Sequence, residues 1–132
     1  MTKEEAKNFF IRDRFAMVTT GIEIDEVAEN YSKCSFKIED KHLAVHNGVM
    51  GGAIYTLADF AFAVASNSET QLTVTTSSNI SYLGQAKDDT LIGECKCIKN
   101  GKRTCLFETV ITDGMGTLVA HVISNGMHIE KR

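Results

Sequence analysis

The segment from Gly51 to Ser66 constrains the fold more than any other part of the sequence, because its residues are almost uniformly small or apolar. Asp59 is the single charged residue in it. A helix that is apolar on every side is buried in a protein, and this one is too short to span a membrane. We therefore expect a long, enclosed helix over 51–66, with the other elements packed around it.

Segments with the pattern of strands flank this helix on both sides. Before it, apolar and polar residues alternate, and a break at Glu29-Asn30 is typical of a hairpin. After it, Asn100-Gly101 is a strong hairpin signal. A single antiparallel sheet curled around the helix would bury both. The predicted strands cover 21–27, 31–38, 72–83, 90–98, 103–112 and 117–129, with turns at 99–102 and 113–116.

The N-terminal segment has helical character from Thr2 to Phe15. Thr2 is placed to cap the helix, with Glu5 at the second position of a capping box. Phe9, Phe10 and Phe15 would form its apolar side. The predicted class is α+β, in one domain spanning 1–132.

Composition narrows the classes of function. A net charge of −3 disfavours a protein that grips duplex nucleic acid by its phosphates. No apolar run approaches the ~18 residues of a membrane span and no signal peptide opens the chain, so we expect a cytoplasmic protein. No C-x-x-C pair is present, and no metal site is expected. The cysteines are therefore interpreted as reduced thiols that pack as small hydrophobic residues: Cys34, Cys95, Cys97 and Cys105.

Two features of the apolar segment suggest chemistry. A carboxylate such as Asp59 is costly to bury without a partner, so it has either a task, a structural partner or partial exposure. Gly51 and Gly52 precede it, and the free N–H groups at the start of a helix bind anions or oxyanions. The alternative is an ordinary tight turn into the helix. Gly51 and Asp59 are about 12 Å apart along a helix, so a substrate must lie along it or the helix must begin after Gly51.

The stretch 51–63, followed by Ala65-Ser66-Asn67, resembles the helix motif of hotdog-fold acyl-CoA thioesterases, and most of all their phenylacetic-acid-degradation (PaaI-type) branch. Weaker matches occur in order at 13–16, 21–22, 79–83, 101–103 and 113–120. The resemblance implies the hotdog fold, a curved antiparallel sheet wrapped around one long central helix, here with an N-terminal helix. It also implies a homodimer or homotetramer.

The resemblance further implies hydrolysis of an acyl-CoA to acid and CoA, with CoA as part of the substrate and no separate cofactor. Asp59 takes the position of the base or nucleophile, and Gly51 that of the oxyanion donor. A hydroxyl from the opposing protomer helps to place the water. The motif around Asn79 assigns this role to Thr75, with Ser77 as its neighbour on the same strand face.

The sequence departs from the family pattern just before the helix. Met50 stands where the family usually has His, and Ala44 where it often has Asn or Gln. His46 and Asn47 lie in the same loop and are the candidates to replace them, beside Met50 and Gly52 as substrate contacts. A changed substrate, a slow enzyme and a non-catalytic acyl-CoA-binding module stay open. A hotdog dehydratase is disfavoured because its His motif is absent.

CoA is a polyanion, so an acidic protein must attract it locally. Lys99, Lys102 and Arg103 cluster at the predicted hairpin around Asn100-Gly101. Their cations are suited to hold phosphates. The alternative is an ordinary solvated hairpin tip.

Overall fold

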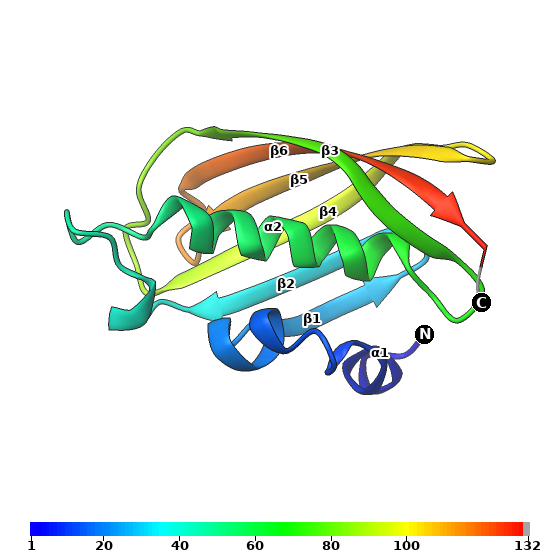
Figure 1. Cartoon of the computed structure of the whole chain (residues 1–132). Helices are drawn as coiled ribbons and strands as arrows, with labels where there is room; N and C mark the ends of the chain where they lie inside the picture. Colours follow the sequence, from blue (N-terminus) through cyan, green and yellow to red (C-terminus); the bar gives the residue numbers. More distant parts are fainter. Residues whose placement is uncertain (131–132) are drawn as a thin grey trace.

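The computed structural model describes residues 1–130 and contains one antiparallel sheet curved around a central helix (Figure 1). The helix α2 (Gly51–Ser66) begins and ends at the predicted residues. The strand order across the sheet is β1-β2-β4-β5-β6-β3. The predicted α+β hotdog architecture is therefore confirmed. The strands are β1 (Glu23–Ala28), β2 (Tyr31–Lys37), β3 (Leu72–Tyr82), β4 (Thr90–Asn100), β5 (Thr104–Asp113) and β6 (Leu118–Ile129).

The strand β3 forms one edge of the sheet. It pairs with β6 on one side, and its other side has no partner strand within residues 1–130. Edge strands present free N–H and C=O groups that another chain can pair with. With 11 residues, β3 is long enough to make such pairing extensive.

The core lies between α2 and the concave face of the sheet. Leu57 and Phe62 of α2 are buried, and the Phe62 ring meets that of Phe107 edge to face with centroids 5.2 Å apart. At Gly93 of β4 the helix comes so close that an added Cβ would lie 3.2 Å from Leu57 Cγ. The absence of a side chain there lets α2 settle against the sheet.

The N-terminal helix α1 (Lys3–Phe10) has the predicted capping box. The Thr2 hydroxyl accepts from the Glu5 N–H, and the Glu5 carboxylate accepts from the Thr2 N–H, both at 3.1 Å.

Within residues 1–130, no helix is long and apolar enough to cross a membrane.

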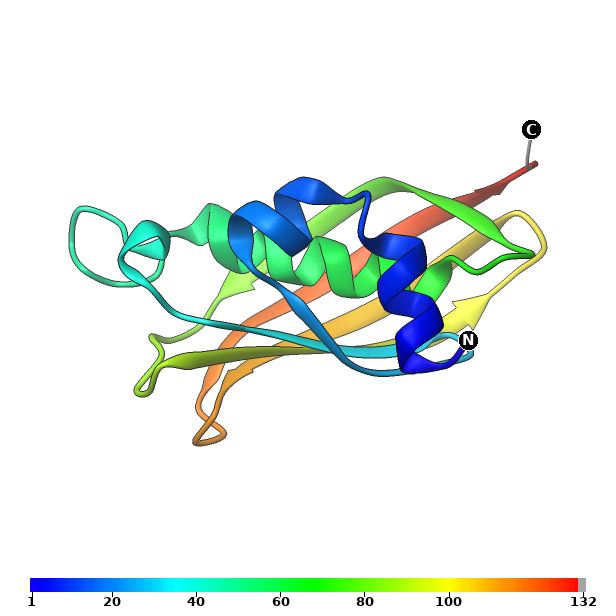
Figure 2. The same ribbon diagram turned by 90° about the horizontal axis from the view of Figure 1, so that it is seen from below.

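The predicted extension of this helix to Phe15 is wrong. The chain turns after Phe10 and forms a separate π-helix, η1 (Phe15–Thr20), which ends at Gly21 with φ 82°. Because of this turn, Phe15 does not share an apolar side with Phe10, and it is 65% exposed. The segment η1 instead lies beside α2 (Figure 2).

The cysteines confirm the structural interpretation. Cys34, Cys95 and Cys105 are buried free thiols, and the half-buried Cys97 packs against the core. Burial raises the pKa of the Cys34 and Cys95 thiols to about 12, which keeps them protonated and unreactive. No group of three or more His, Cys, Asp or Glu in the described part of the chain is placed to hold a metal ion.

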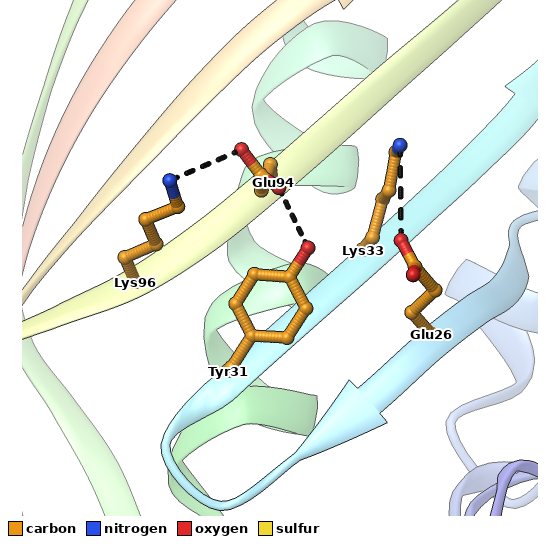
Figure 3. Close-up of polar contacts among 5 residues, drawn as sticks. All are labelled: Glu26, Tyr31, Lys33, Glu94 and Lys96. Carbon is orange, nitrogen blue, oxygen red and sulfur yellow. Dashed lines mark hydrogen bonds and ion pairs between the residues drawn. The ribbon is translucent and has the colours of Figure 1, made fainter.

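The face of the sheet turned away from α2 carries paired charges across β1, β2 and β4 (Figure 3). Lys33 Nζ lies 3.7 Å from Glu26 Oε2, and Lys96 Nζ lies 3.6 Å from Glu94 Oε1. The Tyr31 hydroxyl donates to Glu94 Oε2 at 2.6 Å, which raises the pKa of the tyrosine and lowers that of the carboxyl. These charged and polar side chains lie on the opposite face of the sheet from α2 (Figure 3).

Candidate active site

One stripe of α2 faces away from the sheet and stays open. The sheet covers only part of the helix, so the prediction of a helix enclosed on every side is wrong for this stripe. Asp59 lies in it, is exposed, and has no hydrogen-bond or ion-pair partner among residues 1–130. The stripe follows helical spacing and consists of Gly52, Thr56, Asp59 and Ala63.

Asp59 lies in an open groove between α2 and the N-terminal segment. The side chain is exposed, but the walls of the groove remove part of the water around the carboxyl, and this desolvation raises its pKa; the negative charge of nearby Asp13 raises it further. A raised pKa makes the ionised carboxylate a stronger base, which suits it to take a proton from water. The groove is lined by Asp13, Arg14, Phe15, Tyr55, Phe60 and Ala63.

The first turn of α2 presents free backbone donors. The helix begins at Gly51, and Met50 before it makes no side-chain capping bond. Neither the Gly51 nor the Gly52 N–H has an acceptor within the described residues. The helix dipole favours a negative oxygen at this end. Since α2 does not begin after Gly51, about 12 Å separates Gly51 from Asp59 in one chain.

A cavity adjoins the start of α2. At its side the Tyr82 hydroxyl, from the end of β3, donates to the Gly51 carbonyl at 2.9 Å. His46 from the preceding loop also lines the cavity, so the structure places this predicted residue at the same cavity as Gly51. The cavity is lined by residues that include His46, Val49, Gly51, Ile54, Tyr82 and Gln85.

The two predicted polar residues of the loop before α2, His46 and Asn47, have different environments. His46 is exposed, and its Nδ1 accepts from the Gly48 N–H at 3.0 Å. Asn47 adopts φ 69° in the turn and does not line the cavity. The Met50 side chain lies over Gly52, since a Cβ on that glycine would meet Met50 Cε at 2.8 Å. The loop therefore presents an apolar side chain and one histidine to the helix start.

A bulge in β3 separates the two predicted hydroxyls. Thr75 pairs with Gly126, whereas Ser77 pairs with Asn125, so Thr76 is the extra residue. Adjacent positions on β6 point to opposite faces of the sheet. The prediction that Ser77 shares a face with Thr75 is therefore wrong. Thr75 lies on the helix side, and Ser77 on the outer side.

The predicted phosphate-binding cations lie far from Gly51 in a single chain. Lys99, Lys102 and Arg103 are exposed at the β4–β5 hairpin, which is at the end of the sheet opposite the start of α2 (Figure 1). Lys99 lines a groove with Ser77 and Asn125. These cations do not reach the start of α2 within one chain.

A sequence profile of the thioesterase superfamily matches residues 46–120, more than half of the chain. The chain belongs to the thioesterase superfamily. The matched region contains the loop before α2, the whole of α2 and the strands up to the start of β6. Both Gly51 and Asp59 lie inside it.

Curated relatives of this thioesterase-superfamily chain include one archaeal and one bacterial protein. A putative esterase of Archaeoglobus fulgidus is 29% identical over 118 residues, which are 89% of this chain and 77% of the relative. The acyl-coenzyme A thioesterase PaaI of Escherichia coli is 29% identical over 101 residues, 76% of this chain and 72% of PaaI.

Solved structures show the same fold. The E. coli PaaI structure matches with a TM-score of 0.89 at 22% identity, over 97% of this chain and 94% of PaaI. A hypothetical thioesterase of Streptococcus pneumoniae, solved with coenzyme A, matches with a TM-score of 0.84 at 23% identity, over 93% and 98% of the two chains. The resemblance to PaaI-type hotdog proteins is thus confirmed at the level of family and fold.

Two parts of this thioesterase-superfamily site are missing from the sequence prediction. Asp13 and Arg14 line the groove of Asp59, and Tyr82 bonds to Gly51. Tyr82 lies inside the matched region 46–120, whereas Asp13 and Arg14 precede it. Their linear spacing from α2 nevertheless carries no sign that they flank it, because the turn after α1 and the path of β3 decide their positions.

Proposed function

We propose that this protein hydrolyses an acyl-CoA thioester to a free acid and CoA, with Asp59 as general base or nucleophile and the Gly51 N–H as oxyanion donor. The observation that carries the proposal is an unpartnered carboxylate of raised pKa in an open groove of a thioesterase-superfamily fold. The relative named acyl-coenzyme A thioesterase supports the substrate class.

As a base, Asp59 would take a proton from water while the hydroxide adds to the thioester carbonyl. The carbonyl oxygen becomes an oxyanion that the Gly51 N–H binds, a kind of donor worth about 3 kcal/mol in the transition state. Collapse of this tetrahedral intermediate then breaks the C–S bond, and protonated Asp59 gives its proton to the departing CoA thiolate. As a nucleophile, the carboxylate would form an anhydride, release CoA, and be regenerated by water.

The separation of Gly51 and Asp59 favours a site shared between two copies of the chain. About 12 Å is too long for one carbonyl to contact both groups of the same helix. The open stripe of α2 and the unpaired edge of β3 provide surfaces for a second copy. In our proposal, Gly51 of one copy and Asp59 of its partner act on the same thioester. Thr75 lies exposed on the helix side of the edge strand, where it is available to place the water.

The same arrangement accounts for the hairpin cations. Within one chain, Lys99, Lys102 and Arg103 lie at the opposite end of the sheet from Gly51. In an antiparallel dimer this end of one copy approaches the start of α2 of the other. We infer that these cations contact CoA phosphates across the dimer, and that the assembly is a homodimer or a homotetramer built from it.

The test is thiol release from a panel of phenylacetyl-, hydroxybenzoyl- and straight-chain acyl-CoAs, with Asp59→Asn beside the parent. The substitution removes the base, so turnover should fall about 10²- to 10⁴-fold while the oligomeric state is kept. Glu108→Gln, on the outer face of the sheet, is the matched control and should keep its rate. Parental turnover in Asp59→Asn would refute the assignment of Asp59.

A second candidate is a non-catalytic acyl-CoA-binding module. It is favoured by Met50 and Ala44, which cannot orient a thioester or water as His and Asn or Gln do. Calorimetry with the same panel separates the two candidates. Binding without release of free thiol by the parent protein would establish the module.

A further inference from the structure

Tyr82 ties the edge strand to the first residue of α2. Its hydroxyl donates to the Gly51 carbonyl at 2.9 Å. The ring is also close, since a Cβ built on Gly51 would meet Cζ and Oη of Tyr82 at 3.1 Å. The contact joins residues 31 positions apart in the chain and lies beside the cavity at the helix start.

The hydrogen bond acts on the backbone donors of this turn. The Gly51 carbonyl and the Gly52 N–H belong to the same peptide group, so a donor on the carbonyl polarises that N–H. Such bonds strengthen one another by about 10–30% each. The preceding peptide group is polarised in the same way. It consists of the Met50 carbonyl and the Gly51 N–H, and this carbonyl accepts from the Ala53 N–H at 2.9 Å. The free N–H groups of Gly51 and Gly52 therefore each belong to a peptide group whose carbonyl accepts a hydrogen bond.

We propose that Tyr82 is a positioning residue of the thioester site, which holds the Gly51–Gly52 peptide plane and makes the Gly52 N–H a second donor to the oxyanion. The inference rests on the proposed function. The exposed Met50, which stands where the family usually has His, has no N–H or O–H to offer a thioester, so the donors at this end must come from the backbone. In this chain the Tyr82 hydroxyl would act on the thioester indirectly, by polarising the Gly51–Gly52 peptide group, and would not itself contact the thioester.

The experiment compares Tyr82→Phe with Tyr31→Phe. Each removes one phenol hydroxyl and keeps the ring, and the Tyr31 hydroxyl lies on the outer face of the sheet (Figure 3). We expect Tyr82→Phe to lower kcat about fivefold, equivalent to ~1 kcal/mol of activation free energy, with KM within about twofold. Tyr31→Phe should keep kcat, and thermal melts report any loss of folding in either variant.

A spectroscopic readout separates positioning from a merely structural effect. The panel acyl-CoA that binds best, labelled with ¹³C at the thioester carbonyl, is bound to Asp59→Asn protein with and without Tyr82→Phe. A polarised carbonyl absorbs at lower infrared frequency than in free acyl-CoA, and Tyr82→Phe should move the band back towards the free value.

The outcomes distinguish the role of Tyr82 from the proposed function. Parental kcat in Tyr82→Phe, an equal loss in Tyr31→Phe, or an unmoved carbonyl band overturns the role of Tyr82 and leaves the proposed function standing. A parent that binds acyl-CoA without hydrolysis overturns the proposed function, and the carbonyl band still tests Tyr82. A parent that neither binds nor hydrolyses any panel member overturns both.

Discussion

Ser32 holds the middle of α2 to the sheet, and its removal tests how that helix is anchored. Its hydroxyl, fully buried on β2, donates to the Ala61 carbonyl at 2.6 Å. Ala61 is two residues beyond Asp59 on the same helix. We expect Ser32→Ala to destabilise the protein while leaving the groove of Asp59 and thiol release in place.

The magnitude follows from the state of the acceptor. Ala61 lies inside α2, so its carbonyl keeps its helical partner when Ser32 is truncated, and no group is left without a hydrogen bond. The cost is then that of one ordinary hydrogen bond, about 0.5–1.5 kcal/mol. An unfolding entropy of about 2.1 cal/mol/K per residue gives about 0.28 kcal/mol/K for this chain. The expected fall in Tm is therefore about 2–5 °C.

Thermal unfolding by circular dichroism measures this shift, at one protein concentration because assembly contributes to Tm. Ser35→Ala is the control, since Ser35 lies on the same strand, faces the outer side and makes no side-chain hydrogen bond within residues 1–130. It should change Tm by less than about 2 °C. Equal Tm values for the two variants would refute the argument that the Ser32 bond anchors α2.

The remaining predictions concern the site. Asp13→Asn removes a negative charge that raises the pKa of Asp59, so the ionised base should form at lower pH and the acidic limb of the kcat/KM profile should move down; an unmoved limb would show that Asp13 does not act on Asp59. Gly51→Pro removes the oxyanion donor; the first helical position accepts the proline backbone, and the Tyr82 side chain must shift because an added Cβ would lie 3.1 Å from its Oη. Mixing it with Asp59→Asn should restore thiol release to about a quarter to a half of the parental rate if Gly51 and Asp59 act across the dimer, and restore none if they act within one chain.

The sequence predicts α2 to the residue because composition alone marks it. The segment is small or apolar almost throughout, with Asp59 as its single charge, and it begins at the pair Gly51-Gly52 and ends just before Asn67. The strands follow from alternation and turns in the same local way. Alternation does not reveal an extra residue in one strand. The bulge at Thr76 is such a residue, and because of it Ser77 lies on the other face of the sheet from Thr75. The bulge depends on the register with β6, which no local pattern encodes.

The turn after Phe10 is hidden for a related reason. Helical propensity continues towards Phe15, yet Phe10 is buried against the core and the chain beyond it turns to lie beside α2. Tertiary packing overrides local preference at this point. The consequence is functional, because the redirected segment carries Asp13 into the groove of Asp59.

The exposed stripe of α2 is hard to explain in an isolated chain. Gly52, Thr56 and Ala63 are small, and small side chains along one stripe permit close approach of another surface; a stripe selected only for contact with water has no need of them. If a second copy covers the stripe, as we propose, Asp59 loses more of its water than it does in one chain. Desolvation is already the largest cause that raises its pKa. Assembly would therefore strengthen the base as it brings Gly51 of the partner within reach, so that the dimer, and not the folded chain, is the unit that completes the site.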